Sequence, residues 1–293
     1  MSRTVMGKAL RERVLACCPG VHIDHVVHRT DKTVLLAGTV DDIDVVVKLL
    51  VNADGFWQDK FTAEINTYRA FAQAPPPVPV PHLLGADPDT GVLVTTRLPG
   101  TPVARDRYPA TLHPHDVSVM LDAAQALSTW SAPAGVFMRV WDYPDRFRRY
   151  RAEHQLLDNR DEAALNTLAE AAGPLRLAHG DLLPANVLHR PDGMLTGVLD
   201  WEFTGRFLPG IDAALLWILL GHLPGARQRA EQLAGTAPAD QAGFWANVAT
   251  LCVRELRIHQ ELPDGPLRNQ RLAYLGPTWD TARGRVHELA RQL

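Results

Sequence analysis

The chain has 293 residues, of which 46% are hydrophobic, a formal net charge of -3 and three cysteines. A chain of this length favours more than one hydrophobic core, and its net charge argues against a nucleic acid as the main partner. Cys17, Cys18 and Cys252 form neither a disulfide framework nor a metal-binding spacing, which is typical of a cytoplasmic protein.

The N-terminal part predicts a helix followed by strands. Residues 1–20 resemble an amphipathic helix and lack the uninterrupted apolar segment of an export signal. Runs rich in β-branched residues predict strands at 23–27, 33–38 and 44–50. The last run, DVVVKLL, carries Lys48. A lysine in an edge strand is also a common protection against aggregation, so Lys48 alone indicates no function.

The segment after this strand predicts an amphipathic helix. Four apolar residues recur in it at helical spacing and Glu64 lies beside that stripe; the four are Phe61, Ile65, Tyr68 and Phe71. Glu64 is therefore placed to pair with Lys48. A glutamate that faces water is the ordinary alternative, and Asp59 on the same segment competes for the pairing.

Residues 92–95 predict a short strand that leads into TTRLPGTPV. Pro99, Gly100 and Pro102 prevent a helix or a strand from continuing, so this stretch is interpreted as a linker. Beyond it, helical patterns dominate. They cover residues 116–128, 144–157, 161–172, 211–222, 226–233 and 243–260. The apolar run at 213–221 is too short to span a bilayer and predicts a buried helix, so no membrane partner is expected.

The most informative stretch is AHGDLLPANVLHRPDGMLTGVLDWE, residues 178–202. It holds Asp181, Asn186 and Asp200 in a fixed order, between short strands predicted at 175–179, 186–189 and 195–199. Phosphoryl transfer requires a residue that orients the attacking hydroxyl group and hard oxygen ligands for magnesium. Ordinary turns are also rich in Asp, Asn, Pro and Gly. The complete ordered set between apolar flanks favours the functional interpretation.

HGDLxxxN followed by VLDWE resembles the aminoglycoside phosphotransferase family, relatives of the protein kinases. The resemblance implies an α+β, bilobal protein-kinase-like fold, in which a small N-terminal lobe has an antiparallel sheet and one main helix and a larger C-terminal lobe is mainly helical. We expect a nucleotide-binding lobe at residues 1–96, a hinge at 97–102 and a catalytic and substrate-binding lobe at 103–293.

The resemblance also assigns roles to single residues. Asp181 would be the catalytic base, and Asn186 and Asp200 the Mg²⁺ ligands. Lys48 would hold the phosphates of ATP or GTP, with Glu64 positioning it. Asp212 corresponds to an aspartate that braces the catalytic loop in kinase-like folds.

Contacts with the rest of the nucleotide have less support in the sequence. The backbone around Thr95, Thr96 and Leu98 would receive the adenine ring, although a plain interdomain turn would have the same composition. The loop HRTDK at residues 28–32 contains no glycine, and neither GxGxxG nor a Walker motif occurs there. Thr30 and Thr33 are the candidates for phosphate contacts.

The acceptor must be inferred from the C-terminal part. Residues 224–293 contain seven Asp or Glu against nine Arg, so the surplus of carboxylates that a polycationic aminoglycoside requires is missing. Glu202, Glu255 and Glu261 are the acidic candidates for substrate contacts. For the last two, and for Asp264, we favour pairing with Arg254, Arg257 and Arg268.

Aromatic residues offer another type of acceptor pocket. Trp141 is the aromatic candidate, in a set of rings that would suit a bulkier, less charged antibiotic but belong mostly to a core; the set is Phe137, Trp141, Tyr143, Phe147, Tyr150, Trp245, Tyr274 and Trp279. The sequence thus predicts a cytoplasmic enzyme that phosphorylates a hydroxylated small molecule, with antibiotic inactivation as its leading purpose. A housekeeping kinase for a sugar or amino alcohol and a non-catalytic nucleotide-binding module are the alternatives. The oligomeric state is left open.

Overall fold

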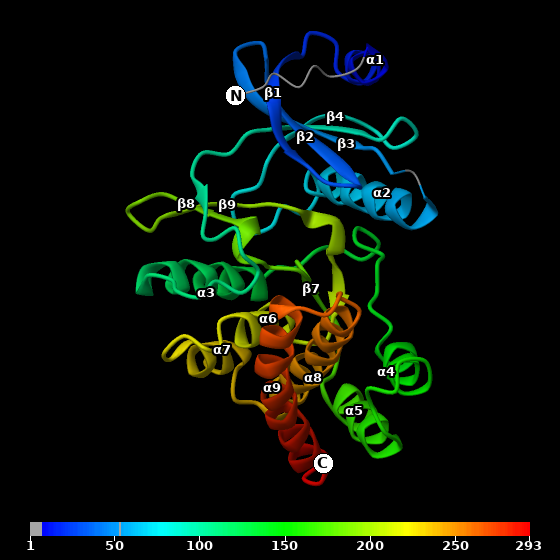
Figure 1. The fold of residues 1–293 in the computed structure, drawn as a ribbon, viewed down its shortest axis with the longest axis vertical. Coiled ribbons are helices and arrows are strands. Elements are labelled where there is room, and N and C mark those ends of the chain that lie inside the picture. Colours follow the sequence, from blue (N-terminus) through cyan, green and yellow to red (C-terminus); the bar gives the residue numbers. More distant parts are fainter. Residues whose placement is uncertain (1–7, 53) are drawn as a thin grey trace. The chain divides into compact units, whose positions relative to one another are not determined.

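An antiparallel sheet of five strands forms the N-terminal part of the chain, in a computed structural model that describes residues 8–52 and 54–293 (Figure 1). The spatial order is β1-β2-β3-β5-β4. The strands are β1 (His22–Arg29), β2 (Thr33–Val40), β3 (Ile43–Leu50), β4 (Leu83–Asp87) and β5 (Val92–Thr96). The four strands predicted from the sequence in this part are present, and β4 is an addition.

A tight hairpin joins β2 and β3. Val40 pairs with Ile43, so Asp41 and Asp42 alone make the turn, with φ values of 48° and 64°. Two successive residues with positive φ suit the right-handed twist of a two-residue hairpin, and aspartate tolerates this conformation better than most residues.

Along β3, side chains alternate between the two faces of the sheet. Val45, Val47 and Leu49 are completely buried in one hydrophobic core, together with Val14 of α1 (Lys8–Cys17). Lys48 therefore projects from the opposite face. Residues 1–7 of the predicted N-terminal helix lie outside the described residues.

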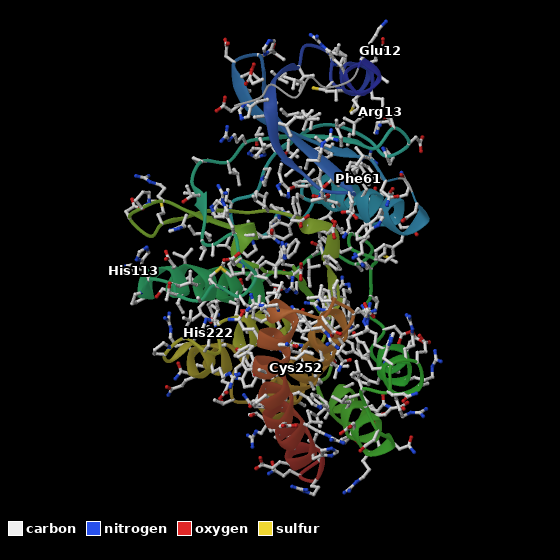
Figure 2. The ribbon with its side chains drawn as sticks, in the orientation of Figure 1. Glu12, Arg13, Phe61, His113, His222 and Cys252 are labelled. Carbon is white, nitrogen blue, oxygen red and sulfur yellow. The ribbon has the colours of Figure 1, made fainter. Side chains whose placement is uncertain are left out.

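Helix α2 (Gly55–Ala70) lies beside the sheet (Figure 1). It begins at the N-cap Asp54, whose side chain accepts a hydrogen bond from the amide of Trp57 at 3.0 Å. The predicted apolar stripe is confirmed, because Phe61 (labelled in Figure 2), Ile65 and Tyr68 on α2 and Phe71 just after it are buried.

A second, three-stranded sheet belongs to the same compact unit. Its order is β6-β8-β9, with β6 (Thr101–Pro102), β8 (Val187–His189) and β9 (Leu195–Val198). The amide of Val198 donates to the carbonyl of Pro79 at 3.0 Å, which ties β9 to the N-terminal part of the chain. The first unit thus runs through Pro102 and also includes Ala132–Val136 and Asn186–Thr204.

The second unit is mainly helical and holds Val103–Ser131, Phe137–Ala185 and Gly205–Leu293. Its strands β7 (Arg176–Ala178) and β10 (Gly205–Phe207) pair antiparallel. Its helices are α3 (Pro114–Ser128), α4 (Tyr143–Ala152), α5 (Asn159–Ala171), α6 (Ile211–Leu219), α7 (Ala226–Ala234), α8 (Pro238–Gln260) and α9 (Pro266–Ala290). The six helices predicted for this part are present. The sequence did not predict α9.

Helices α6 and α8 form the interior of this unit. Every residue of α6 is buried, as its apolar run predicted. Cys252 of α8, labelled in Figure 2, is also completely buried. Of the aromatic set expected in a core, six rings are buried and two, Tyr274 and Trp279, are partly exposed. In the described part of the chain, no helix is both long and apolar enough to cross a membrane.

Candidate active site

Lys48 is the centre of an ion-pair cluster in the first unit. Its Nζ atom lies 2.7 Å from Oε2 of Glu64 and 3.0 Å from Oδ1 of Asp200. It also lies 4.0 Å from Oε2 of Glu202. These residues come from β3, α2 and the turn after β9, so three segments that are distant in the sequence converge on one ammonium group.

Lys48 and Glu64 are well shielded from solvent, whereas the side chain of Asp200 is 40% exposed. The side chain of Lys48 is 17% exposed and that of Glu64 is 3% exposed. Burial alone would lower the pKa of Lys48, but the charges of Asp200, Glu64 and Glu202 outweigh it and raise the pKa well above its ordinary value. Burial, together with the charges of Asp200 and Glu202, raises the pKa of Glu64 to about 7, against the opposing effect of Lys48.

The carboxylates of this cluster outnumber its one ammonium group. One oxygen from each of Glu64, Asp200 and Glu202 lies within 4.8 Å of the others. Hard oxygen donors with a surplus of negative charge are the ligands that Mg²⁺ prefers, so these residues fit such an ion. Glu202, a candidate for substrate contact in the sequence, thus lies among the acids around Lys48.

Asp200 has an unusual backbone conformation, with φ 63° and ψ 67°. A residue other than glycine adopts this left-handed region at a cost, which is typical of functional sites. It starts the turn Trp201–Phe203, whose Trp201 is completely buried. The carbonyl of Asn186 accepts a hydrogen bond from the amide of Leu199 at 2.8 Å. This bond brings the backbone of Asn186 beside the residue that precedes Asp200.

Asp181 belongs to the second unit, on a loop that Asp212 supports. The carboxylate of Asp212, in the first turn of α6, accepts hydrogen bonds from the amides of His179 (3.1 Å) and Gly180 (2.8 Å). The amide of Asp181 donates in turn to Nδ1 of His179, which is completely buried. The bracing role predicted for Asp212 is therefore confirmed in its geometry. Burial raises the pKa of Asp212 despite these two donors.

Two arginines approach the side chain of Asp181. Nη2 of Arg107 lies 3.7 Å and Nη2 of Arg254 lies 3.5 Å from Oδ1 of Asp181. Both guanidinium groups also bind Glu255, which is completely buried. Sequence reasoning predicted the Arg254–Glu255 pair and missed Arg107, because no motif or spacing connects residue 107 to residue 181 or 255.

Glu255 was a candidate for substrate contact, but its surroundings make it a buried anion within the protein. Arg107 donates to it from Nε at 3.0 Å and from Nη2 at 2.8 Å, and the hydroxyl of Tyr108 donates at 2.8 Å. Burial would raise the pKa of Glu255, but the guanidinium groups of Arg107 and Arg254 and these bonds lower it to about 2. At neutral pH Glu255 is thus ionised, and its carboxylate is already bound by Arg107, Tyr108 and Arg254.

The other acceptor candidates also have partners within the protein. Glu261 pairs with Arg257 at 3.3 Å, and Asp264 pairs with Arg268, as the spacing predicted. Trp141 is buried, its ring centroid lies 5.2 Å from that of Phe207, and the guanidinium of Arg146 stacks over it at 3.5 Å. Trp141 is therefore a core ring covered by an arginine.

The candidate nucleotide contacts lie in the first unit. Thr95 on β5 is buried, while Thr96 exchanges hydrogen bonds with the backbone of His82 at 2.9 Å. The side chain of Leu98 packs so closely on Gly197 that a Cβ atom there would lie 2.2 Å from it. Thr30 is exposed in the turn between β1 and β2, where its hydroxyl accepts a hydrogen bond from the amide of Thr33 at 2.9 Å.

Comparison with known proteins identifies the family. The model of the phosphotransferase enzyme family, APH, matches residues 28–251, which is well over half of the chain. The chain belongs to this family. As a member it is a phosphotransferase with an alcohol group as acceptor, and the family resemblance expected from HGDLxxxN and VLDWE is confirmed. No curated protein matches the chain significantly.

Solved structures show the same fold. A choline/ethanolamine kinase family protein from Mesorhizobium loti has a TM-score of 0.63 at 17% identity, covering 97% of this chain and 99% of that one. Wild-type aminoglycoside 2'-phosphotransferase-IIIa, as its GDP complex, has a TM-score of 0.60 at 17% identity, covering 93% and 98%.

A third comparison is a thermostable mutant of aminoglycoside phosphotransferase APH(4)-Ia, in a ternary complex with AMP-PNP and hygromycin B. Its TM-score is 0.54 at 16% identity, covering 97% of this chain and 98% of that one. At such identities the likeness shows the fold alone. This phosphotransferase family member therefore has the predicted protein-kinase-like fold.

Proposed function

We propose that this phosphotransferase moves the γ-phosphoryl group of ATP or GTP to a hydroxyl group of a small molecule. The observation that carries the proposal is the convergence of Lys48, Glu64 and Asp200, at 2.7 and 3.0 Å, in a chain of this family. A lysine held by a helical glutamate is the arrangement with which kinases orient nucleotide phosphates. Nucleotides in the complexes of APH(4)-Ia and aminoglycoside 2'-phosphotransferase-IIIa support a nucleotide donor.

In this proposal Asp181 accepts the proton of the substrate hydroxyl and orients its oxygen. That oxygen forms a bond to the γ-phosphorus, the bond from this phosphorus to the β,γ-bridging oxygen breaks, and the nucleoside diphosphate leaves. Asp212 keeps the loop of Asp181 in place through the amides of His179 and Gly180. Lys48 aligns the phosphates of the donor.

Asn186 and Asp200 would hold Mg²⁺, as the HGDLxxxN and VLDWE blocks predict. When bound, the ion would neutralise part of the negative charge of the nucleotide phosphates. The carboxylate-rich surroundings of Asp200 support this assignment, because Glu64 and Glu202 add negative charge without adding a cation. The contact of Lys48 with Asp200 at 3.0 Å holds that carboxylate beside Glu64 and Glu202.

Two purposes compete for this chemistry. Antibiotic inactivation is supported by structural neighbours that are aminoglycoside phosphotransferases, and a metabolite kinase by the choline/ethanolamine kinase family neighbour. The two arginines at 3.5 and 3.7 Å from Asp181 disfavour a polycationic acceptor. They favour a metabolite, or an antibiotic with little positive charge, over an aminoglycoside.

The test is a measurement of nucleoside diphosphate release from ATP and GTP with Mg²⁺, over a panel of hydroxylated antibiotics and metabolites, with the product identified by mass spectrometry. Asp181→Asn should lower kcat by about 10²- to 10⁴-fold while the Kd for nucleotide changes little. Asp145→Asn, which alters an exposed ion pair with Arg148, is the matched control and should leave kcat unchanged. Nucleotide binding without any phosphorylated product would instead support a non-catalytic module.

A further inference from the structure

Two guanidinium groups form one wall beside the carboxylate of Asp181. Arg107 comes from the segment before α3 and Arg254 from α8, and both lie within 4 Å of the same Asp181 oxygen. Arg254 is 11% exposed and Arg107 is 31% exposed, so the charges are partly removed from water. Such charges interact more strongly with a ligand than surface charges do.

The buried Glu255 fixes the position of this pair. It lies beneath both guanidinium groups and accepts five hydrogen bonds, two from Arg107, two from Arg254 and one from Tyr108. Side chains anchored in this way lose little entropy when they bind a ligand, which is a requirement for specific recognition. Arg107 and Arg254 are therefore preorganised.

Arg107 and Arg254 can bind a ligand in addition to Asp181. Their contacts with Asp181 measure 3.5 and 3.7 Å, longer than the bonds to Glu255 at 2.8–3.3 Å. Within the described residues, the contacts with Glu255 and Asp181 use Nε and Nη2 of each arginine. The Nη1 groups remain as donors, and a planar guanidinium group is well suited to bind a carboxylate or phosphate.

Further cations surround the pair. Arg271 stacks over the ring of Tyr108 at 4.5 Å. The charge of Arg254 is among the causes that lower the pKa of Arg146, after burial, so Arg146 is close enough for the two to repel each other. Two further positive charges therefore act on this region, one of them through the ring of Tyr108 that binds Glu255. An additional ammonium group would be repelled here, whereas an anion would reduce this repulsion.

We propose that Arg107 and Arg254 form an acceptor subsite beside Asp181 and that it takes a hydroxylated compound with a carboxylate or phosphate group. This proposal rests on the proposed function, because it uses Asp181 as the group that orients the acceptor hydroxyl. The anionic group of the acceptor binds the guanidinium pair. Its hydroxyl is thereby directed to Asp181.

Two matched sets of compounds test the charge preference. The first contains gluconate, glucose 6-phosphate, neutral glucose and cationic glucosamine, and the second contains 4-hydroxybutyrate, its neutral amide and 4-aminobutanol. Calorimetry gives the Kd of each compound, and release of nucleoside diphosphate gives kcat/KM. We expect the anions to bind at least tenfold more tightly than their neutral partners, with the cations weakest. Comparison of gluconate with glucose 6-phosphate shows whether the subsite prefers a carboxylate or a phosphate.

The variant Arg254→Met tests the residue. For the anionic compounds it should raise Kd and KM at least tenfold, and the rise for the neutral compounds should be several-fold smaller. Arg254→Lys keeps the charge and should restore part of the affinity, which covers the case in which the Met variant does not fold. Arg257→Met, three residues along α8, removes a pairing with Glu261 and is the matched control.

Two results would overturn the anionic subsite. One is binding of anions no tighter than that of their neutral and cationic partners. The other is an equal loss of kcat on all acceptors in Arg254→Met, which would mean that the guanidinium acts on the transferred phosphoryl group. Failure of the proposed function looks different, because anions would then bind with the expected preference while no compound in either set or in the wider panel is phosphorylated.

Discussion

Lys48 and Asp200 lie 152 positions apart in the chain, yet Nζ of one is 3.0 Å from Oδ1 of the other. The alternation of β3 turns Lys48 away from the apolar core of the sheet, and the end of β9 delivers Asp200 to the same place. The pair therefore links two sequence motifs, DVVVKLL and VLDWE, that were assigned separately to phosphate and metal binding.

Replacing Lys48 with methionine should impair both activity and stability. Productive placement of the phosphates would be lost, so we expect kcat/KM for ATP to fall by about 10²-fold or more. The buried Glu64 would lose its partner, at a cost of about 3–5 kcal/mol in the free energy of unfolding. Steady-state kinetics and denaturant unfolding measure the two effects.

The double variant Lys48→Met with Glu64→Gln separates these effects, because it removes both charges of the pair. It should regain much of the stability but none of the activity. Lys8→Met, which removes an exposed pairing with Glu12, is the matched control and should change neither quantity. Unchanged kinetics in Lys48→Met would contradict the role of this lysine.

Asp212→Asn tests the support of the catalytic loop. The two carboxylate oxygens of Asp212 accept hydrogen bonds from two backbone amides. Asparagine has a single side-chain oxygen, so one of these buried amides would face the NH₂ group of asparagine, which is also a donor. We expect a loss of about 1–3 kcal/mol in stability and a lower kcat, with little change in the KM for ATP. Asp240→Asn, which weakens a surface pair with Arg176, provides the comparison. A kcat equal to that of the unaltered protein would show that the loop holds its shape without Asp212.

Local patterns predicted most of the fold because they are strong in this chain. Four of the five strands of the first sheet and six helices of the second unit follow from alternation and helical spacing within single segments. Helix α9 was missed because its buried residues, Leu275, Thr278, Ala282 and Val286, are few for a helix of 25 residues and Pro277 lies within it. Its stability comes from packing against α8, which no local pattern reveals.

The residues of the candidate site also differ in whether a local pattern predicts them. Lys48, Glu64 and Asp200 were predicted because each lies in a recognisable motif, and their mutual contacts agree with that assignment. The contacts of Arg107 with Asp181 and Glu255 were not predicted, because no motif contains Arg107. Arg107 and Glu255, for example, lie 148 positions apart in the chain. Such pairs depend on how α8 packs, so only the folded structure shows the two arginines beside Asp181.

The low pKa of Glu255 predicts a specific loss of stability in acid. Its pKa of about 2 lies below the ordinary value of 4.5, so the folded protein holds the ionised form more tightly than the unfolded chain does. This contribution is complete above about pH 4.5 and is lost as the pH falls towards 2. For a buried group the difference corresponds to about 3 kcal/mol.

Chemical denaturation of the unaltered protein and of Glu255→Gln between pH 7 and pH 2.5 measures this contribution. The variant should be less stable at pH 7, since it leaves Arg107 and Arg254 without their counter-ion. The difference between the two proteins should then shrink as the pH falls below 4.5, because Glu255 of the unfolded chain binds a proton at a higher pH than Glu255 of the folded protein does. Glu153→Gln, at an exposed pair with Arg149, should behave like the unaltered protein throughout. A difference that stays constant down to pH 2.5 would mean that the charge of Glu255 does not hold the arginine pair in place.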